Sequence, residues 1–336
     1  MIAGLVLALG VAFGVAFGAA AGPPGEPPAP DSLHGTVVTD TLWSQALGTN
    51  KAVIVYLPPS YASTPSARYP VAYYLHGLGG TETDWTSHGR LDAVMDSLVA
   101  AGGPEMLVVM PDGDDGWYTT WNSLVTLEAC RKTAPTREKA DTYCVPWQHY
   151  DDYIARDVVQ FTDRKYRTRA DRRHRAIAGL SMGGYGTMAL AFEYPDVFAA
   201  AASHSGVLSP LYQGPHPFDG HPQWAADGVT LEKAGGRLWP FIAPAFGKDT
   251  AAWWSRDPAR RLEHLVARDG RAAVPVLFVD CGTEDGLVDQ NRAFKWSVER
   301  LGVAIVYHEW PGKHDWPYWT AHVGESLQWI GTEIAK

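Results

Sequence analysis

The chain has 336 residues, of which 46% are hydrophobic and 19% charged, so it is long enough to bury one large core or two modest ones. Its 28 basic and 37 acidic side chains give a formal net charge of −9 at pH 7. Nucleic-acid phosphates and anionic membrane surfaces attract the opposite sign of charge, so we expect neither as a partner.

The N-terminal segment, residues 1–21, is apolar and uncharged and ends in Ala19-Ala20-Ala21, an A-x-A cleavage signal. This pattern predicts an export signal, and hence a secreted or periplasmic protein with no stable membrane partner after cleavage. An uncleaved membrane anchor is the alternative, because the apolar run is long and no basic residue precedes it. We expect residues 22–33 to be a Pro-rich linker and residues 34–336 to be the main folded domain.

From residue 34 onward, apolar runs alternate with helical patterns. Seven runs are predicted as strands: Ala52–Leu57, Val71–Leu75, Met106–Met110, Ile177–Leu180, Ala199–Ser203, Val276–Asp280 and Ile305–His308. Between and after them, helical stripes comprise Tyr150, Ile154, Val158 and Phe161, then Phe294, Val298 and Leu301, then Trp319, Val323, Leu327, Ile330 and Ile334. The alternation predicts an α/β fold with a mostly parallel sheet covered by helices on both faces.

Two stretches, residues 114–148 and 207–270, interrupt this alternation. We expect both to be insertions over the carboxyl ends of the strands, where such sheets bind ligands. Cys130 and Cys144 lie in the first stretch, and we expect them to form a disulfide, as is typical of exported proteins. Cys281 ends an apolar run and is predicted to be a small buried residue.

The segment Gly179-Leu180-Ser181-Met182-Gly183 matches the pattern G-x-S-x-G between a predicted strand and a predicted helix. A nucleophile elbow needs this setting, because the serine adopts an unfavourable backbone conformation and the glycines remove side chains that would clash. The alternative is a serine in a Gly-rich helix start. The context favours Ser181 as a nucleophile.

A serine nucleophile needs a base and an acid, which in this architecture follow it in the chain on loops after strands. His314 lies between the last predicted strand and the last helical stripe, and is predicted to be the base. Glu284 and Asp285 both follow the strand Val276–Asp280, and either one could be the acid.

A glycine-rich turn, His76-Gly77-Leu78-Gly79-Gly80, follows the predicted strand Val71–Leu75. Such a turn can present backbone N–H groups to a substrate carbonyl oxygen, and together with the N–H of Met182 it would complete an oxyanion hole. The alternative is a turn required only for a sharp bend.

Further candidates for substrate contact are His76 and Gly77 of this turn and several tryptophans. Aromatic faces suit both a sugar and a phenolic acid, although core packing is the simpler explanation for any one of them. The tryptophans in segments expected to border the site are Trp117, Trp121, Trp147, Trp316 and Trp319, of which Trp117 and Trp316 are the leading candidates.

His216 and His221 are the residues that could suggest a metal. No further ligand cluster accompanies them, so they are interpreted as loop residues, and we expect no metal.

Five segments in a fixed order resemble one known family: VIVYLPPSY, PVAYYLHGLGG, AGLSMGGYGTMALA, CGTEDGLVDQNRAF and GKHDWPYW. They resemble the esterase D / putative esterase family of α/β-hydrolases, which includes feruloyl and acetyl-xylan esterases, S-formylglutathione hydrolases and antigen 85 mycolyltransferases. The resemblance covers roughly Gly35 to Trp329. It implies an α/β-hydrolase fold without a cofactor, with Ser181 as nucleophile, Asp285 as acid, His314 as base, and the N–H groups of Leu78 and Met182 as oxyanion donors.

These observations together predict a secreted serine ester hydrolase that acts through an acyl-enzyme on short-chain or aromatic acyl esters, either small molecules or linked to polysaccharide. An acyltransferase of the mycolyl type and a non-catalytic binding protein are the alternatives. A binding protein would be expected to lack a triad member, and none is missing. The first half of residues 207–270 is too polar, we expect, to line the long apolar channel that a mycolate needs.

Overall fold

The structure is a computed structural model that describes residues 34–336 except 124, 137 and 138. The predicted export signal and linker, residues 1–33, lie outside the described residues. Within the described part of the chain, no helix is both long enough and apolar enough to span a membrane.

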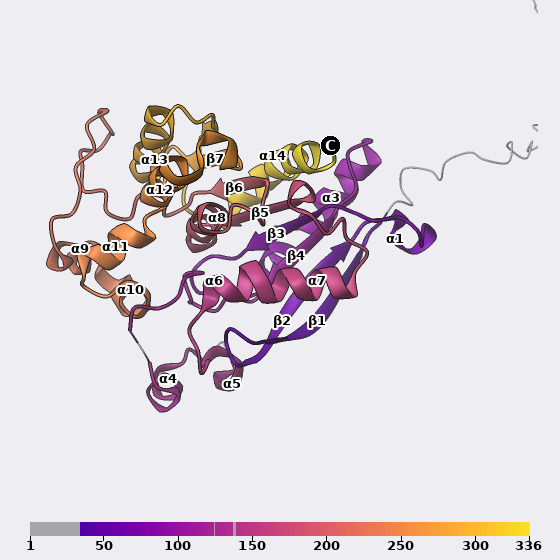
Figure 1. Ribbon diagram of the computed structural model, residues 1–336, viewed down its shortest axis with the longest axis horizontal. Helices are drawn as coiled ribbons and strands as arrows, with labels where there is room; N and C mark the ends of the chain where they lie inside the picture. The colour runs from indigo at the N-terminus through magenta and orange to yellow at the C-terminus, as the bar shows by residue number, and fades with distance from the viewer. Residues whose placement is uncertain (1–33, 124, 137–138) are drawn as a thin grey trace, which may run out of the picture.

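A single sheet of eight strands runs through the molecule in the order β1-β2-β4-β3-β5-β6-β7-β8 (Figure 1). β2 is antiparallel to both β1 and β4, and the pairs from β4 to β8 are parallel, which confirms the mostly parallel sheet. The strands are β1 (Thr36–Ser44), β2 (Thr49–Leu57), β3 (Val71–Leu75), β4 (Leu107–Pro111), β5 (Arg175–Leu180), β6 (Ala200–His204), β7 (Val276–Gly282) and β8 (Val306–Trp310).

Helices connect the strands and form a layer on each side of the sheet. They are α1 (Ser60–Ser63), α2 (Asp84–Ser87), α3 (Leu91–Ala100), α4 (Leu127–Thr133), α5 (Ala140–Tyr143), α6 (Tyr150–Asp152), α7 (Val159–Lys165), α8 (Met182–Glu193), α9 (Gly228–Gly235), α10 (Trp239–Phe246), α11 (Thr250–Arg256), α12 (Pro258–Asp269), α13 (Val288–Arg300) and α14 (Trp316–Ile334). A π-helical turn, η2 (Tyr153–Val158), joins α6 to α7, and single turns of 3-10 helix are η3 (Arg172–His174), η4 (Gly236–Leu238) and η5 (Arg271–Ala273).

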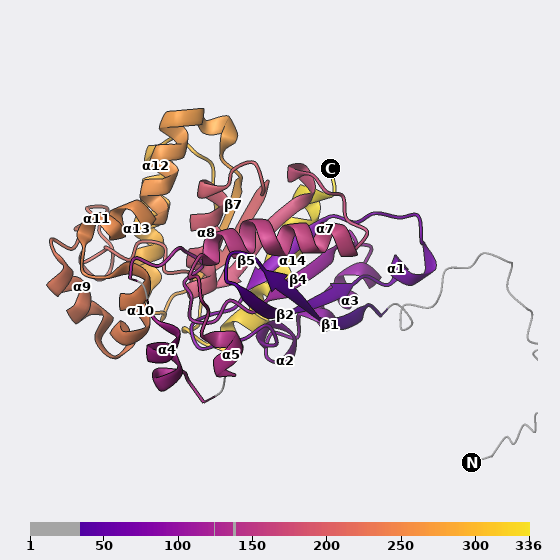
Figure 2. The same cartoon turned by 60° about the horizontal axis from the view of Figure 1, so that its bottom comes forward.

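The core has two layers because successive side chains of a strand point to opposite faces of the sheet. Tyr73 of β3 packs into the cluster beneath α7, α8, α12 and α13, whereas Tyr74 packs into the cluster beneath α3 and α14. α7 and α14 accordingly lie on opposite sides of the strands (Figure 2). The central strands are buried on both faces, which explains why the sequence shows them as continuous apolar runs.

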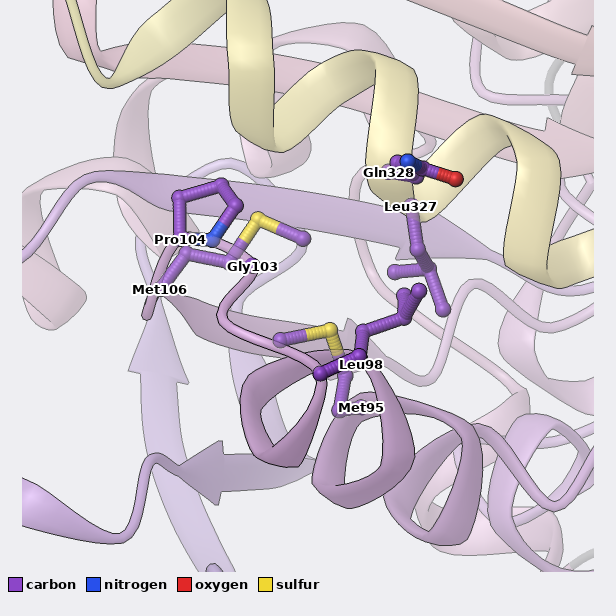
Figure 3. A pocket seen from close by; sticks show the side chains of 8 residues that line it. Met95, Leu98, Gly103, Pro104, Met106, Leu327 and Gln328 are labelled. Carbon is purple, nitrogen blue, oxygen red and sulfur yellow. The ribbon is translucent and has the colours of Figure 1, made fainter.

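A small cavity of about 70 Å³ lies between α3 and α14 (Figure 3). None of the described residues that line it has a charged or nucleophilic side chain, so it is a packing gap rather than a reactive site. Its lining residues are Met95, Leu98, Ala101, Gly103, Pro104, Met106, Leu327 and Gln328.

The two irregular stretches fold into short helices. The first contains α4 and α5, which are linked by the expected Cys130–Cys144 disulfide, and Cys281 is free and buried as predicted. In the second, α9, α10 and α11 lie together at one end of the molecule (Figure 1). α12, at the end of that stretch, packs with α8 and so belongs to the helix layer of the core.

Candidate active site

Ser181 is the only residue between the end of β5 and the start of α8. Its backbone has φ 53° and ψ −114°, a strained conformation for a residue with a side chain. Gly179 and Gly183 permit this turn: a Cβ on Gly179 would lie 2.6 Å from the carbonyl carbon of Gly183, and one on Gly183 would lie 2.6 Å from the carbonyl oxygen of His76. The local geometry is that of a nucleophile elbow.

His314 lies on the loop between β8 and α14, and its ring bridges two other candidate residues. Its Nε2 lies 2.9 Å from Oγ of Ser181, and its Nδ1 lies 2.8 Å from Oδ2 of Asp285, which follows β7. Burial by itself raises the pKa of Asp285, but hydrogen bonds from His314 and from the N–H of Leu287 outweigh burial and hold that pKa below its ordinary value. The carboxylate is therefore ionised where it faces the imidazole.

The two adjacent acidic residues occupy different environments. The side chain of Asp285 is 0% exposed and reaches His314, whereas that of Glu284 is 61% exposed and faces Lys313 at 4.0 Å. The geometry thus brings Asp285, and not Glu284, to the histidine.

A second Ser-His-Asp arrangement lies in the core. Oγ of Ser326 is 2.8 Å from Nε2 of His204, and Nδ1 of His204 is 2.6 Å from Oδ2 of Asp280. All three residues are fully buried, so no substrate can reach this serine. His204 nevertheless supports the elbow, because its carbonyl oxygen accepts the N–H of Ser181 at 2.9 Å.

The glycine-rich turn after β3 lies against the elbow. A Cβ on Gly77 would be 3.5 Å from Cβ of Ser181 and 2.6 Å from Cδ1 of Leu180. The backbone N–H groups of Leu78 and Met182 donate to no other group in the described part of the chain. Met182 is also the first residue of α8, so its N–H belongs to the positive end of the helix dipole.

The structure does not bring every candidate residue to the large cavity that opens beside Ser181. His76 is buried, with Nδ1 2.8 Å from the carbonyl oxygen of Gly77 and Nε2 accepting the N–H of Gly113, so it holds the turn from behind and cannot contact a substrate. Gly77 likewise forms the turn without lining the cavity.

Only one of the five tryptophans, Trp117, lines the cavity. Trp316 packs edge-on against Trp85 and Trp319, and the edge-on ring of Trp319 lies 5.0 Å from that of His314. The other two are elsewhere: Trp121 stacks on Tyr150, and Trp147 is exposed. Trp316 is partly buried and is not among the described residues that line this cavity, so its contact with a substrate stays a prediction.

A cavity of about 500 Å³ opens beside Ser181, and helices of the 207–270 stretch form much of its wall. Besides Ser181, Asp285 and His314, it is lined by Leu78, Trp117, Val207, Pro210, Gln213, Leu231, Ala234, Gly235, Leu238, Ile242, Trp253, Gly286, Leu287 and Gln290. The first half of this stretch was expected to be too polar for a long apolar channel, yet the side chains that it contributes to the wall are mostly apolar; the absence of a long channel stays a prediction. Three charged residues of the stretch are engaged elsewhere: Asp227 caps α9, and Glu232 pairs with Lys248.

Sequence reasoning included Trp117 but missed the acidic residues of its loop, residues 112–118, and their buried partner Lys51; this loop follows β4 and lies against the glycine-rich turn. Asp114, Trp117 and Tyr118 all have positive φ, a concentration of strain that is typical of functional sites. Lys51 is fully buried between Asp112 and Asp114, at 2.6 Å from each carboxylate. The one sequence signal is the run DGDDG after a predicted strand, at the sheet edge where ligands bind.

Within the described residues, no group of three or more His, Cys, Asp or Glu side chains is arranged to hold a metal ion. His216 instead contacts the carboxylate of Asp289, and His221 lies near Asp219.

The fold and the elbow define the class of protein, an α/β-hydrolase with a Ser-His-Asp arrangement at the carboxyl edge of its sheet. Residues 44–330 match the family model described as "Putative esterase", and the chain belongs to that family.

The chain is similar to an esterase of Mycobacterium tuberculosis, with 29% identity over 280 residues, which are 81% of this chain and 54% of that protein. It is 30% identical over 171 residues to an endo-1,4-beta-xylanase/feruloyl esterase of Xylanibacter ruminicola, covering 50% of this chain and 21% of that protein. The chain thus spans about half the length, or less, of these two relatives. A solved ferulic acid esterase superposes with a TM-score of 0.66 at 28% identity, covering 90% of this chain and 99% of the other.

Proposed function

We propose that this protein is a serine carboxylic ester hydrolase. The observation that carries the proposal is the continuous chain of contacts from Asp285 through His314 to Ser181 at the wall of an open cavity. Family membership and the similarity to esterases support the same reaction class.

In the proposed mechanism, Nε2 of His314 takes the proton of Ser181 as Oγ attacks the ester carbonyl carbon. Asp285 accepts the Nδ1–H of His314, which fixes the tautomer and stabilises the imidazolium. The N–H groups of Leu78 and Met182 donate to the oxyanion of the tetrahedral intermediate.

Collapse of this intermediate breaks the bond to the alkoxy group, which leaves as the alcohol with the proton from His314. Water then attacks the acyl-enzyme and gives its proton to His314. The acid departs, and Ser181 regains its proton.

The cavity suggests which acyl groups fit. Its volume of about 500 Å³ is in the range of sites for small ligands, and its wall is apolar with the indole rings of Trp117 and Trp253. We infer short-chain or aromatic acyl esters as substrates, either small molecules or groups attached to polysaccharide. Aromatic side chains provide flat apolar surface for a phenolic acyl group.

The test is turnover of p-nitrophenyl esters of graded chain length and of methyl ferulate, with Ser181→Ala as the control. We expect hydrolysis of short and aromatic esters, falling as the chain lengthens, and a loss of about a thousandfold in the variant. Turnover that survives in Ser181→Ala would contradict the mechanism.

An acyltransferase would use the same three residues, so the acceptor has to be tested separately. Incubation of the enzyme with a short-chain ester and excess trehalose or glucose should give free acid as the main product. A product mixture dominated by acyl sugar would contradict hydrolysis and identify the protein as an acyltransferase.

We also infer that the protein works outside the cytosol, because disulfides such as Cys130–Cys144 persist in oxidising compartments. Mass spectrometry of the protein from its native host should find this bridge and a mature N-terminus near Gly22. An intact Met1 in the membrane fraction would instead indicate an anchor.

A further inference from the structure

The glycine-rich turn that carries Leu78, residues 76–80, is held from below by the loop of residues 112–118. Three hydrogen bonds join the two loops. The N–H of Gly113 donates to Nε2 of His76 at 2.8 Å, the hydroxyl of Tyr118 donates to the carbonyl oxygen of His76 at 3.0 Å, and the N–H of Gly79 donates to Oδ1 of Asp115 at 2.7 Å. Of these three contacts, only the one with Asp115 is made by a residue adjacent to Leu78 in the chain, Gly79.

Asp115 is itself held by the segment that the disulfide closes. The hydroxyl of Tyr143 donates to Oδ2 of Asp115 at 2.9 Å, and Tyr143 directly precedes Cys144, which is bonded to Cys130. The two oxygens of one buried carboxylate therefore bind the turn on one side and the disulfide segment on the other.

A second contact ties the same segment to the same loop. Nζ of the buried Lys51 donates to the carbonyl oxygen of Thr142 at 3.1 Å, while it also lies 2.6 Å from Asp112 and from Asp114. Two consecutive residues before Cys144 are thus bonded to the network under the turn.

The turn needs such support because of its composition. Gly77, Gly79 and Gly80 have wide conformational freedom, and Gly79 has a φ of +79°. A charge-assisted hydrogen bond to the N–H of Gly79 fixes the peptide plane that follows Leu78. An oxyanion donor has to be placed to within a fraction of an ångström to stabilise developing charge.

We propose that Asp115 and Tyr143 are positioning residues of the oxyanion hole, and that the Cys130–Cys144 disulfide contributes to catalysis through them. The proposal rests on the proposed esterase function. It assigns a catalytic purpose to the disulfide segment, none of whose described residues lines the cavity.

The test measures kcat, KM and the inhibition constant of phenylboronic acid, which forms a tetrahedral adduct with an active-site serine. Loss of a whole oxyanion donor lowers kcat by about 10²–10³, and misplacement of a donor should cost less. We expect kcat to fall about fivefold in Tyr143→Phe, about tenfold in Asp115→Asn and about thirtyfold in Asp115→Ala. KM should stay within about twofold, and the boronic acid constant should rise in parallel with the loss of kcat.

Two matched controls have the same chemistry away from the site. The hydroxyl of Tyr166 donates to Asp40 at 2.9 Å, and Asp96 accepts the N–H of Gly35 at 2.8 Å. Tyr166→Phe and Asp96→Asn should leave kcat and the boronic acid constant unchanged. A comparable loss of kcat in these controls would overturn the proposal, because the effect would then be general destabilisation.

The disulfide is tested by a thermodynamic cycle. Cys130→Ala/Cys144→Ala should lower kcat by about the same factor as Tyr143→Phe. The variant that combines all three substitutions should lose no more than either of these two, because the disulfide and Tyr143 hold the same carboxylate, that of Asp115. Independent, multiplicative losses would overturn the link between the bridge and Asp115. So would unchanged kcat in folded Asp115→Asn and Tyr143→Phe.

Failure of this proposal differs from failure of the proposed function. If the wild type turns over esters in a manner that requires Ser181 while the Asp115 and Tyr143 variants match it, only the positioning role is wrong. If turnover does not require Ser181, the esterase mechanism is wrong.

Discussion

Gly183→Ala is the substitution for which the structure predicts the clearest separation of activity from stability. The residue lies in the first turn of α8, against the end of β3. A Cβ there would be 2.6 Å from the carbonyl oxygen of His76 and closer still to that of Leu75, and neither main-chain atom can rotate away. To restore ordinary contact distances, the start of α8 has to move by about 1 Å, which would displace Ser181 and the N–H of Met182 together.

A displacement of this size can cost about a hundredfold in rate, and we expect that loss in kcat/KM. The effect on stability should be smaller: overpacking costs about 1–3 kcal/mol, while alanine in a helix is favoured over glycine by about 1 kcal/mol. The assay is ester turnover with a thermal unfolding curve for each variant.

Gly324→Ala is the matched control, since it is also a glycine-to-alanine change within a helix, α14. A Cβ on Gly324 would have its nearest contact with Val94 at 3.5 Å, an ordinary distance. This variant should keep full activity and gain about 0.5–1 kcal/mol of stability. If Gly183→Ala keeps more than half of the wild-type kcat/KM, the close approach of α8 to β3 is not needed to place the nucleophile.

Three further predictions concern other parts of the site and core. Asp285→Asn should lower kcat by about 10³ or more, whereas Glu284→Gln should change it less than about twofold, because only Asp285 reaches His314; the reverse order in steady-state assays would reassign the acid. Burial raises the pKa of Asp257 to about 7, so the folded state holds a proton that the unfolded state releases near pH 4, and stability should fall as pH rises from about 4 to about 7. In urea unfolding, the free energy of unfolding of Asp257→Asn should depend less on pH than that of the wild type, and at pH 8 it should be greater by at most about 4 kcal/mol. An unchanged slope of this free energy against pH would refute the prediction. Ala234→Trp should partly fill the cavity and raise KM for aromatic acyl esters by about tenfold with little change for acetate, and equal effects on both would place the acyl group elsewhere.

The sequence predicted the sheet where its strands are buried on both faces, because those strands appear as continuous apolar runs. It did not reveal β1, in which Leu42 and Ser44 are the only buried residues. An edge strand with one face in solvent has a weak hydrophobic signal, and its hairpin with β2 became visible only in the fold.

The candidate nucleophile and base could be predicted because chain order and local context constrain them. Ser181 has glycines on both sides in a strand-to-helix turn, and His314 lies on the loop after the last predicted strand. The choice between Glu284 and Asp285 could not be made from spacing, because both residues are on one loop and only the direction of each side chain distinguishes them.

The residues that support the glycine-rich turn could not be predicted from the sequence, for a different reason. The buried carboxylates of Asp112 and Asp114 are paired with Lys51, which is far away in the chain and lies between them. Long-range pairing of this kind leaves no periodic pattern in the sequence. The polarity of the cavity wall was misjudged for a similar reason, since composition does not show that Asp227 caps α9 or that Glu232 pairs with Lys248.

Detection of the acyl-enzyme is the most direct test of Ser181 as the nucleophile. Wild-type protein is mixed with p-nitrophenyl acetate, quenched in acid within the first turnover, digested and analysed by mass spectrometry, in parallel with Ser181→Ala. If Ser181 is the nucleophile, we expect a single acetyl group on the peptide that contains Ser181 in the wild type, and none on that peptide in the variant. An acetyl group on another residue, with turnover unchanged in Ser181→Ala, would contradict it.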